Sequence, residues 1–147
     1  MDDILLNLDG KATQKAVENT LRQYRTYQLT TPEELLPTIT PKYTLDMPSF
    51  GGTVSSKTES AAIKNIEHFQ QAKIFFEKFN NGLYKLNRRE RQIIIKAFLE
   101  EIPMFNYQIA DELKVSERTF YRMKAQALYK LALALRVEVY VEDVKSS

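Results

Sequence analysis

Residues 106–135, NYQIADELKVSERTFYRMKAQALYKLALAL, contain two helical patterns separated by a short break. In the first pattern, apolar residues recur at three- and four-residue steps, and Asn106 can cap the N-terminus. The second pattern is longer, begins after the capping residue Ser116 and reaches about Leu135. Two helices of roughly two and five turns joined by so tight a turn predict a helix-turn-helix.

The side chains of this segment suit such a packing. Ala110 lets the second helix approach the first closely, and Val115 fills the corner between them. The residues expected to face the core from the second helix are Phe120, Met123, Ala127, Leu128 and Leu131. The residues that then point outward are Glu117, Arg118, Thr119, Tyr121, Arg122, Ala125 and Gln126. The N-terminal part of such a helix enters the major groove, where Arg can donate two hydrogen bonds to guanine.

Basic residues are concentrated in this part of the chain. The whole 147-residue sequence carries a net charge of only +2, from 21 Lys and Arg against 19 Asp and Glu. Between residues 114 and 136, six basic residues accompany a single acid, which gives a net charge of +5. Such a local excess is typical of a surface that binds a polyanion. The alternative is a solvated basic face, but a helix that is merely kept soluble usually interleaves acids and bases.

Two further helices are expected upstream. Apolar residues at helical steps predict an amphipathic helix over 11–27, and the seven-residue repeat of Ala62, Phe69 and Phe76 predicts a longer one over 60–81, ended by Asn80-Asn81-Gly82. Sixteen of the thirty-one residues in 28–58 are Thr, Ser, Pro or Gly, a composition typical of a linker. We therefore expect an all-α helical bundle with three parts: an N-terminal amphipathic helix region (1–27), a linker (28–58) and a helical DNA-binding domain (59–147).

Another helix is predicted just before the helix-turn-helix. Asn87 and Glu90 have the spacing of a capping box, and Pro103 follows the expected end of this helix near residue 101. Arg88 and Arg89 fall in its first turn, where positive charge opposes the helix dipole. A DNA phosphate would relieve that repulsion. An exposed charged turn balanced by nearby acids explains the two arginines equally well.

The C-terminal residues and the aromatic repeat bear on the oligomeric state. Residues 137–142 alternate apolar and polar side chains, which predicts a short strand or an extended tail that needs a partner on this chain or another. The stripe of Ala62, Phe69 and Phe76 predicts either a core or a dimer interface. Together these features predict a homodimer, with packing inside one chain as the alternative.

The sequence also resembles two related protein families. Region 4 of bacterial sigma factors, which reads the promoter −35 element, is similar to residues 86–94, 109–116 and 127–131. The ArpU family of phage-encoded transcriptional regulators of Gram-positive hosts is similar over most of the chain, at residues 16–18, 21–25, 58–63, 115–124, 131–132 and 137–140. The resemblance implies a transcription activator of late phage genes that acts with host RNA polymerase and has no enzyme activity. Physical reasoning does not separate an activator from a repressor.

The predicted partner is double-stranded DNA. The predicted DNA-binding residues are Ser116, Glu117, Arg118, Thr119, Tyr121, Arg122, Lys124, Gln126, Arg88 and Arg89. By likeness to sigma factors, most of the outward-facing residues of the second helix fall where recognition helices touch DNA. Many helix-turn-helix sequences have Gly where this chain has Lys114, and the recognition face differs from that of sigma factors. The resemblance therefore transfers no target sequence.

Composition argues against several other classes of protein. The chain has no Cys and a single His, His68, so disulfides, thiol catalysis and a His-based metal site are not expected. No carboxylates cluster with His or Lys at a catalytic spacing, and we expect neither enzyme activity nor a cofactor. No apolar run reaches the roughly 18 residues that cross a bilayer, and the N-terminus is acidic where a signal peptide is basic, so a cytoplasmic protein is expected.

Two alternatives to a DNA-binding activator remain open. One is a sigma-like factor that binds the core of RNA polymerase. The other is a helical adaptor whose basic helix docks on an acidic protein and which ignores DNA sequence. Binding that weakens with salt and prefers one DNA site separates a DNA reader from an adaptor.

Overall fold

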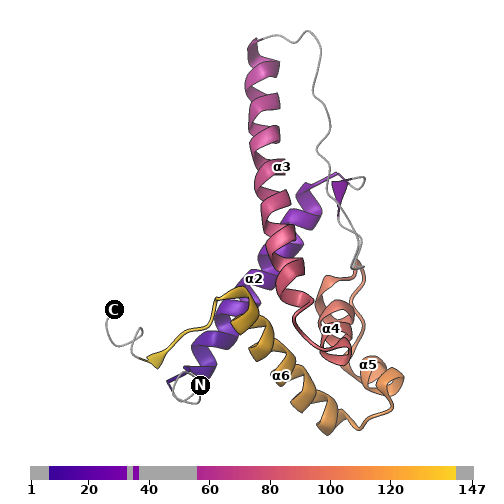
Figure 1. The fold of residues 1–147 in the computed structure, drawn as a ribbon. Coiled ribbons are helices and arrows are strands. Elements are labelled where there is room, and N and C mark those ends of the chain that lie inside the picture. Colours follow the sequence, from indigo (N-terminus) through magenta and orange to yellow (C-terminus); the bar gives the residue numbers. More distant parts are fainter. Residues whose placement is uncertain (1–6, 33–34, 37–55, 142–147) are drawn as a thin grey trace.

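The computed structural model describes residues 7–32, 35–36 and 56–141, and all regular elements in these ranges are helical (Figure 1). This confirms the predicted all-α fold. The elements are α2 (Gly10–Thr30), α3 (Ser56–Leu83), α4 (Arg88–Ile94), the π-helical turn η2 (Ile95–Leu99), α5 (Asn106–Leu113) and α6 (Glu117–Leu135). None of the helices in these ranges combines the length and the apolar character that crossing a bilayer requires.

The first two helices are longer than predicted. Asp9 caps α2, with its carboxylate accepting a hydrogen bond from the backbone N–H of Ala12 at 3.0 Å. The predicted end of α3 at Asn80-Asn81-Gly82 is wrong, because the helix continues through Leu83. Gly82 serves close packing instead, since a Cβ atom there would lie 2.4 Å from the Cδ2 atom of Leu135.

The linker predicted over residues 28–58 is shorter at both ends. Residues 28–30 form the last turn of α2, and residues 56–58 belong to α3. Leu35 is buried against the helices, so the chain just beyond α2 also contributes to the core. The remainder of the predicted linker, residues 37–55, lies outside the described residues.

The main hydrophobic core lies where α2, α3 and α6 meet, and α2 and α3 cross at the centre of Figure 1. Aromatic rings join the two crossing helices. The ring centroid of Tyr24 lies 5.1 Å from that of Phe76 in an edge-on arrangement, and 4.7 Å from that of Phe79. Helix α6 closes the core with buried Ala127, Leu128, Leu131, Ala132 and Leu135. One end of α6 is therefore fixed between the two longest helices.

The two ends of the described chain pair with each other. The backbone N–H of Asp9 donates to the carbonyl of Val139 at 2.8 Å, and that of Val141 donates to Asn7 at 2.7 Å, around an antiparallel bridge between Leu8 and Tyr140. The buried hydroxyl of Thr13 also accepts a hydrogen bond from the N–H of Val139 at 3.0 Å. The predicted extended C-terminal segment is confirmed, and its partner lies on the same chain.

Both features that predicted a homodimer thus have partners inside one chain. Phe76 is fully buried against α2, Phe69 is partly buried against the same core, and the C-terminal segment pairs with residues 7–9. Ala62 lies among residues whose side chains the structure does not describe. The homodimer stays a prediction, to be tested by sedimentation as a mass near 17.1 kDa or near twice that value.

Candidate nucleic-acid interface

Helices α5 and α6 are joined by a three-residue turn, residues 114–116, as predicted. Lys114 adopts a left-handed backbone conformation with φ of 58°, and the N–H of Val115 donates to the carbonyl of Ala110 at 3.1 Å. Ser116 then caps α6, because its hydroxyl oxygen accepts a hydrogen bond from the N–H of Thr119 at 3.1 Å. The turn is closed by local hydrogen bonds even though Lys, and not Gly, holds the left-handed position.

The predicted cap of the shorter helix is wrong. Asn106 is the first residue of α5, and Phe105 occupies the cap position. The side-chain oxygen of Gln108 accepts a hydrogen bond from the N–H of Phe105 at 3.0 Å, which satisfies one free amide at this end. The side-chain oxygen of Asn106 is used elsewhere, because it accepts a hydrogen bond from the ammonium group of Lys124 at 3.2 Å.

A second, smaller core holds α5 and α6 against α4. Ile93, Ile109 and Phe120 are fully buried in it, and Ala110 is nearly so. The partly buried side chains around this cluster are Ala97, Met104, Leu113, Val115 and Met123. Ala110 lies in this cluster and Val115 packs against it, in keeping with the places predicted for them at the helix crossing and at the corner. The angle between α5 and α6 is therefore fixed by packing that is separate from the main core.

One side of the N-terminal half of α6 is open to solvent. Glu117, Arg118, Tyr121, Arg122, Ala125 and Gln126 are exposed there, and Thr119 is half-buried. Arg118 and Arg122 lie one helical turn apart and share this side. Among the residues that the structure describes, neither guanidinium group has a hydrogen-bond or ion-pair partner. The structure thus brings most of the predicted DNA-binding residues together on one exposed face, which we call the outward face of α6.

The surface of unpaired positive charge formed by residues 114–136 is smaller than the sequence indicates. Lys130 forms an ion pair with Glu90 at 2.5 Å, and Arg136 lies 3.7 Å from the carboxylate of Glu138. Because these cations have acidic partners, much of the local excess charge is balanced. Of the six cations between residues 114 and 136, those that stay exposed without a partner in the described chain are Lys114, Arg118 and Arg122, all near the start of α6.

Lys124 does not lie on the outward face with the other predicted residues. It is half-buried, hydrogen-bonded to Asn106 and placed with its ammonium nitrogen 5.1 Å from the ring centroid of Phe98. Burial lowers the pKa of the Lys124 side chain below its ordinary value, and the nearby carboxylate of Glu18 partly opposes that effect. Lys124 thus points into a hollow between α6, η2 and α2.

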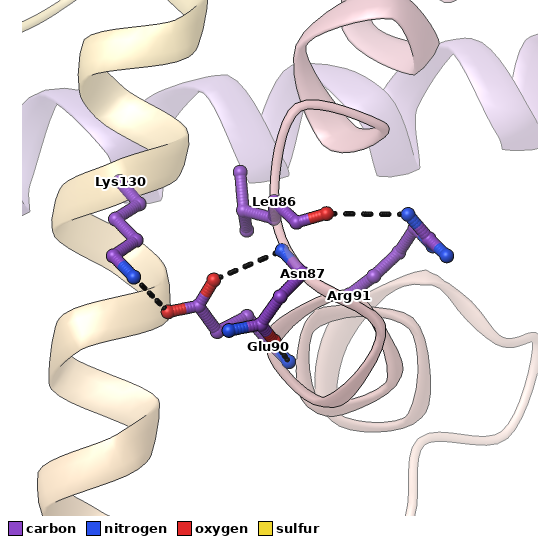
Figure 2. A network of polar contacts seen from close by, with 5 residues as sticks. All are labelled: Leu86, Asn87, Glu90, Arg91 and Lys130. Atoms are coloured by element: carbon purple, nitrogen blue, oxygen red, sulfur yellow. Dashed lines mark hydrogen bonds and ion pairs between the residues drawn. The ribbon is translucent and has the colours of Figure 1, made fainter.

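The start of α4 is tied to α6 by one carboxylate (Figure 2). Asn87 and Glu90 form the predicted capping box, with each side chain accepting a hydrogen bond from the other residue's backbone N–H at 2.8 and 3.0 Å. The second oxygen of the buried Glu90 carboxylate binds Lys130 of α6. Beside them, the guanidinium group of Arg91 donates to the carbonyl of Leu86 at 3.2 Å. The capping box is local and predictable from sequence, whereas the link to Lys130 is not.

Arg88 and Arg89 are exposed at the start of α4, as predicted, but they do not join the outward face of α6. The ion pair to Glu90 places the start of α4 beside Lys130, eight residues beyond Arg122 along α6, or about 12 Å. Within the described chain, Arg88 and Arg89 have no hydrogen-bond or ion-pair partner. The predicted DNA-binding residues therefore form two separate groups: the outward face of α6, and Arg88 with Arg89 at the start of α4.

Two side chains of α2 hold the segment that leads to α5, and sequence reasoning missed both of them. Arg25 donates hydrogen bonds to the carbonyls of Phe98 at 3.1 Å and Glu100 at 2.7 Å, and Gln28 donates to that of Leu99 at 3.0 Å. These carbonyls end the π-helical turn η2 and would otherwise lack partners. Because each contact joins residues more than seventy positions apart, no local pattern could have revealed them.

The arrangement presents hydrogen-bond donors and positive charge to solvent. Within residues 7–32, 35–36 and 56–141, no group of three or more His, Asp or Glu side chains could hold a metal ion. The exposed arginines, the hydroxyl groups of Ser116 and Tyr121 and the amide of Gln126 are suited to phosphates and base edges.

The chain is similar to proteins of phages and to a phage-related bacterial protein. The chain is 28% identical over 137 residues to "Putative autolysin regulatory protein ArpU" of Streptococcus phage O1205, covering 93% of each chain. This relative is a phage protein. The chain is also 28% identical to protein Gp66 of Listeria phage A118, over 86% of this chain and 87% of the relative. It is 27% identical to "Uncharacterized phage-related protein Lin1259/Lin1739" of Listeria innocua, over 92% of this chain and 94% of the relative.

No family model matches the chain, and no solved structure matches it. The similarity to phage proteins extends over nearly the full length, so it includes α2 and α3 as well as the pair α5 and α6. One of these relatives is named as a regulatory protein.

Proposed function

We propose that this protein is a sequence-specific DNA-binding transcription regulator in which α5 and α6 act as a helix-turn-helix. The observation that carries the proposal is the pair Arg118 and Arg122, exposed side by side and without partners in the described chain. Exposed basic side chains without partners contribute little to the stability of the fold, because only water satisfies their polar groups. In the major groove the same groups can each donate two hydrogen bonds to guanine.

The surrounding residues supply complementary contacts in this proposal. Glu117 can accept a hydrogen bond from cytosine, and Gln126 can make two hydrogen bonds to adenine. Ser116, Thr119 and Tyr121 lie at the edge of the face, where hydroxyl groups meet phosphates. Arg88 and Arg89 contact the backbone further along the duplex, beside the C-terminal half of α6.

The regulatory step that we propose is activation of phage late genes together with host RNA polymerase. Two observations support it: the similarity to phage and phage-related proteins over nearly the whole chain, and the regulatory name of one relative. Transcription in vitro with purified host polymerase tests this step, because an activator raises the transcript level from a template that contains the binding site. A sigma-like factor would instead bind the polymerase core in the absence of DNA.

The binding site can be found by selection from a random-sequence duplex library with the full-length protein. Arg118→Ala or Arg122→Ala should then weaken binding to the selected duplex by about 1–3 kcal/mol and weaken binding to a scrambled duplex much less. Lys64→Ala, which removes an exposed cation from the distant α3, is the matched control and should change neither affinity.

Each other outcome has a definite meaning. Equal losses on both duplexes would assign that arginine to a phosphate. A library that yields no enriched sequence would contradict sequence-specific binding, and binding to an acidic protein without any affinity for DNA would favour the adaptor. Loss of affinity with rising salt should accompany DNA binding, because contacts to phosphates release counterions.

A further inference from the structure

One side of α2 carries a row of charged residues that the proposed recognition face does not include. Lys11, Lys15, Glu18 and Arg22 follow one another at four-, three- and four-residue steps, so they share one side of the helix. Lys11, Lys15 and Arg22 are exposed, and in the described chain none of them has an ion-pair partner. The row therefore has three cations against one carboxylate, although residues 1–60 as a whole are acidic.

This row is continuous with the outward face of α6. A surface hollow of about 430 Å³ between α2, η2 and α6 is lined by Arg22 and Lys124, and an adjoining hollow of about 230 Å³ is lined by Lys124 and Tyr121. Both hollows share Gln14 of α2 as a wall, and a third shallow one beside Gln14 reaches Lys11. The shared lining residues Gln14 and Lys124 thus join the charged row of α2 to Tyr121 of the outward face.

The crossing of α2 and α6 fixes where the charged row lies relative to the outward face. Helix α2 packs across the C-terminal half of α6, since Leu21 and Leu128 share the main core and Gly10 lies against the ring of Tyr129. Arg118 and Arg122 belong to the other half of α6, which extends away from the crossing of α2 and α3 (Figure 1). A duplex on this half meets the corner formed by α2 and α6.

We infer that Lys11, Lys15 and Arg22 contact the phosphate backbone that borders the major groove read by α6. The inference rests on the proposed function, because it assigns a second surface to the same duplex. Charge complementarity supports it. Arg22 lines the hollow between α2 and α6, and Lys11 and Lys15 line the neighbouring hollow on α2. A DNA strand presents a phosphate about every 3.4 Å along the helix axis, so a backbone that passes this corner can meet all three cations. Contacts of this kind position the protein and add affinity without adding sequence information.

Replacing Glu18 should change the affinity for DNA in the opposite direction to replacing the cations. Its carboxylate accepts a hydrogen bond from the side chain of Gln14 at 3.1 Å and lies within the charged row. A carboxylate at this place repels phosphates. Glu18→Gln should therefore raise the affinity a few-fold at low salt, by the same factor on the selected and the scrambled duplex, and the gain should shrink as salt is added.

The main experiment measures affinity between about 50 and 200 mM salt for the triple variant Lys11→Gln, Lys15→Gln, Arg22→Gln. The plot of log affinity against log salt should become shallower by about 0.9 for each phosphate that the variant no longer binds, equally on both duplexes. The control variant Lys64→Gln, Lys73→Gln, Lys78→Gln makes the same change of charge on α3 and should keep the wild-type slope. Exchanging the three row residues for the other cation (Lys11→Arg, Lys15→Arg, Arg22→Lys) should also keep it.

The outcomes separate this inference from the proposed function. A wild-type salt slope in the triple variant, with Arg118→Ala still losing its preference for the selected duplex, would overturn the inference and leave the function intact. An equal fall of the slope in the α3 control would also overturn it, because net charge alone would then explain the effect. A wild-type protein that binds no duplex would overturn both.

Discussion

The two halves of α6 contrast in almost every property, although they form one uninterrupted helix. The C-terminal half buries five side chains between α2 and α3, and its cation Lys130 is paired with Glu90. The N-terminal half buries only Phe120 completely and leaves Arg118 and Arg122 exposed without partners in the described chain. One half anchors the helix, and the other presents side chains to solvent.

The contrast shows that a local excess of charge in a sequence has to be corrected for tertiary pairing. Six cations between residues 114 and 136 indicate a uniform basic surface. In the fold, Lys124, Lys130 and Arg136 all make polar contacts with other side chains or lie close to a carboxylate. The basic surface that remains is a short face at the N-terminal end of the helix. The structure therefore limits the candidate binding surface to fewer residues than the sequence does.

The largest effect is expected from the anchoring half. Leu131→Ala removes a fully buried side chain from the main core and should lower the free energy of unfolding by about 3 kcal/mol. Arg122→Ala in the presenting half should change it by less than about 0.5 kcal/mol, because an exposed side chain without partners contributes little. Chemical denaturation measures both. Comparable destabilisation of the two variants would contradict the division of α6.

A smaller effect is expected where α4 is tied to the anchoring half. Glu90→Ala removes the capping box and the ion pair and should cost about 2 kcal/mol. Glu90→Gln keeps an acceptor for the N–H of Asn87 and should cost less. Lys130→Ala should cost no more than about 1 kcal/mol, because the Lys130 side chain is more than half exposed. A larger destabilisation by Lys130→Ala than by Glu90→Ala would assign the stability to the ion pair.

A substitution in the turn before the N-terminal half of α6 should make the protein more stable. Lys114→Gly removes the strain of a left-handed backbone at a residue with a Cβ atom and should raise the free energy of unfolding by about 0.5–1 kcal/mol. Thermal unfolding measures the gain, and Lys114→Ala, which keeps the Cβ atom, is the control. A lower stability of the Gly variant would mean that the Lys side chain itself stabilises the turn.

The smallest effect is expected at Lys124, which lies between the two halves. Lys124→Met keeps the packing on Phe98 and removes a partly desolvated charge, so stability at neutral pH should be equal to or slightly above that of the wild type. Because burial lowers the pKa of Lys124, the wild type should gain stability relative to the variant as the pH rises toward 10.5. A difference that does not depend on pH would contradict this assignment.

The success of prediction from sequence depends on the range of each interaction. The Ser116 cap and the Asn87–Glu90 capping box depend on residues three positions apart, and both are confirmed. The predicted helix end at Gly82 is wrong because glycine there serves the approach of Leu135, more than fifty residues away. The partner of the C-terminal segment escapes prediction for the same reason.

The predicted binding residues are a mixed case. Helical periodicity places Arg118 and Arg122 on one exposed side, because the period of a helix is known in advance. It cannot show that Lys124 turns toward Phe98 and Asn106, since those contacts depend on how η2 and α5 lie against α6. The contact of these residues with DNA stays a prediction.

The direction in which α6 leaves the rest of the fold depends on the number of residues in the π-helical turn η2. The hydrogen bond from Glu100 to the carbonyl of Ile95, 3.1 Å long, spans five residues, so this turn contains one residue more than an α-helical turn. Deleting one codon here would restore α-helical register and rotate the chain beyond the turn by about 100° relative to α4. Arg25 and Gln28 would then face different carbonyls. An insertion or deletion at this place would therefore change the direction in which the outward face of α6 points, without changing a single residue of α6.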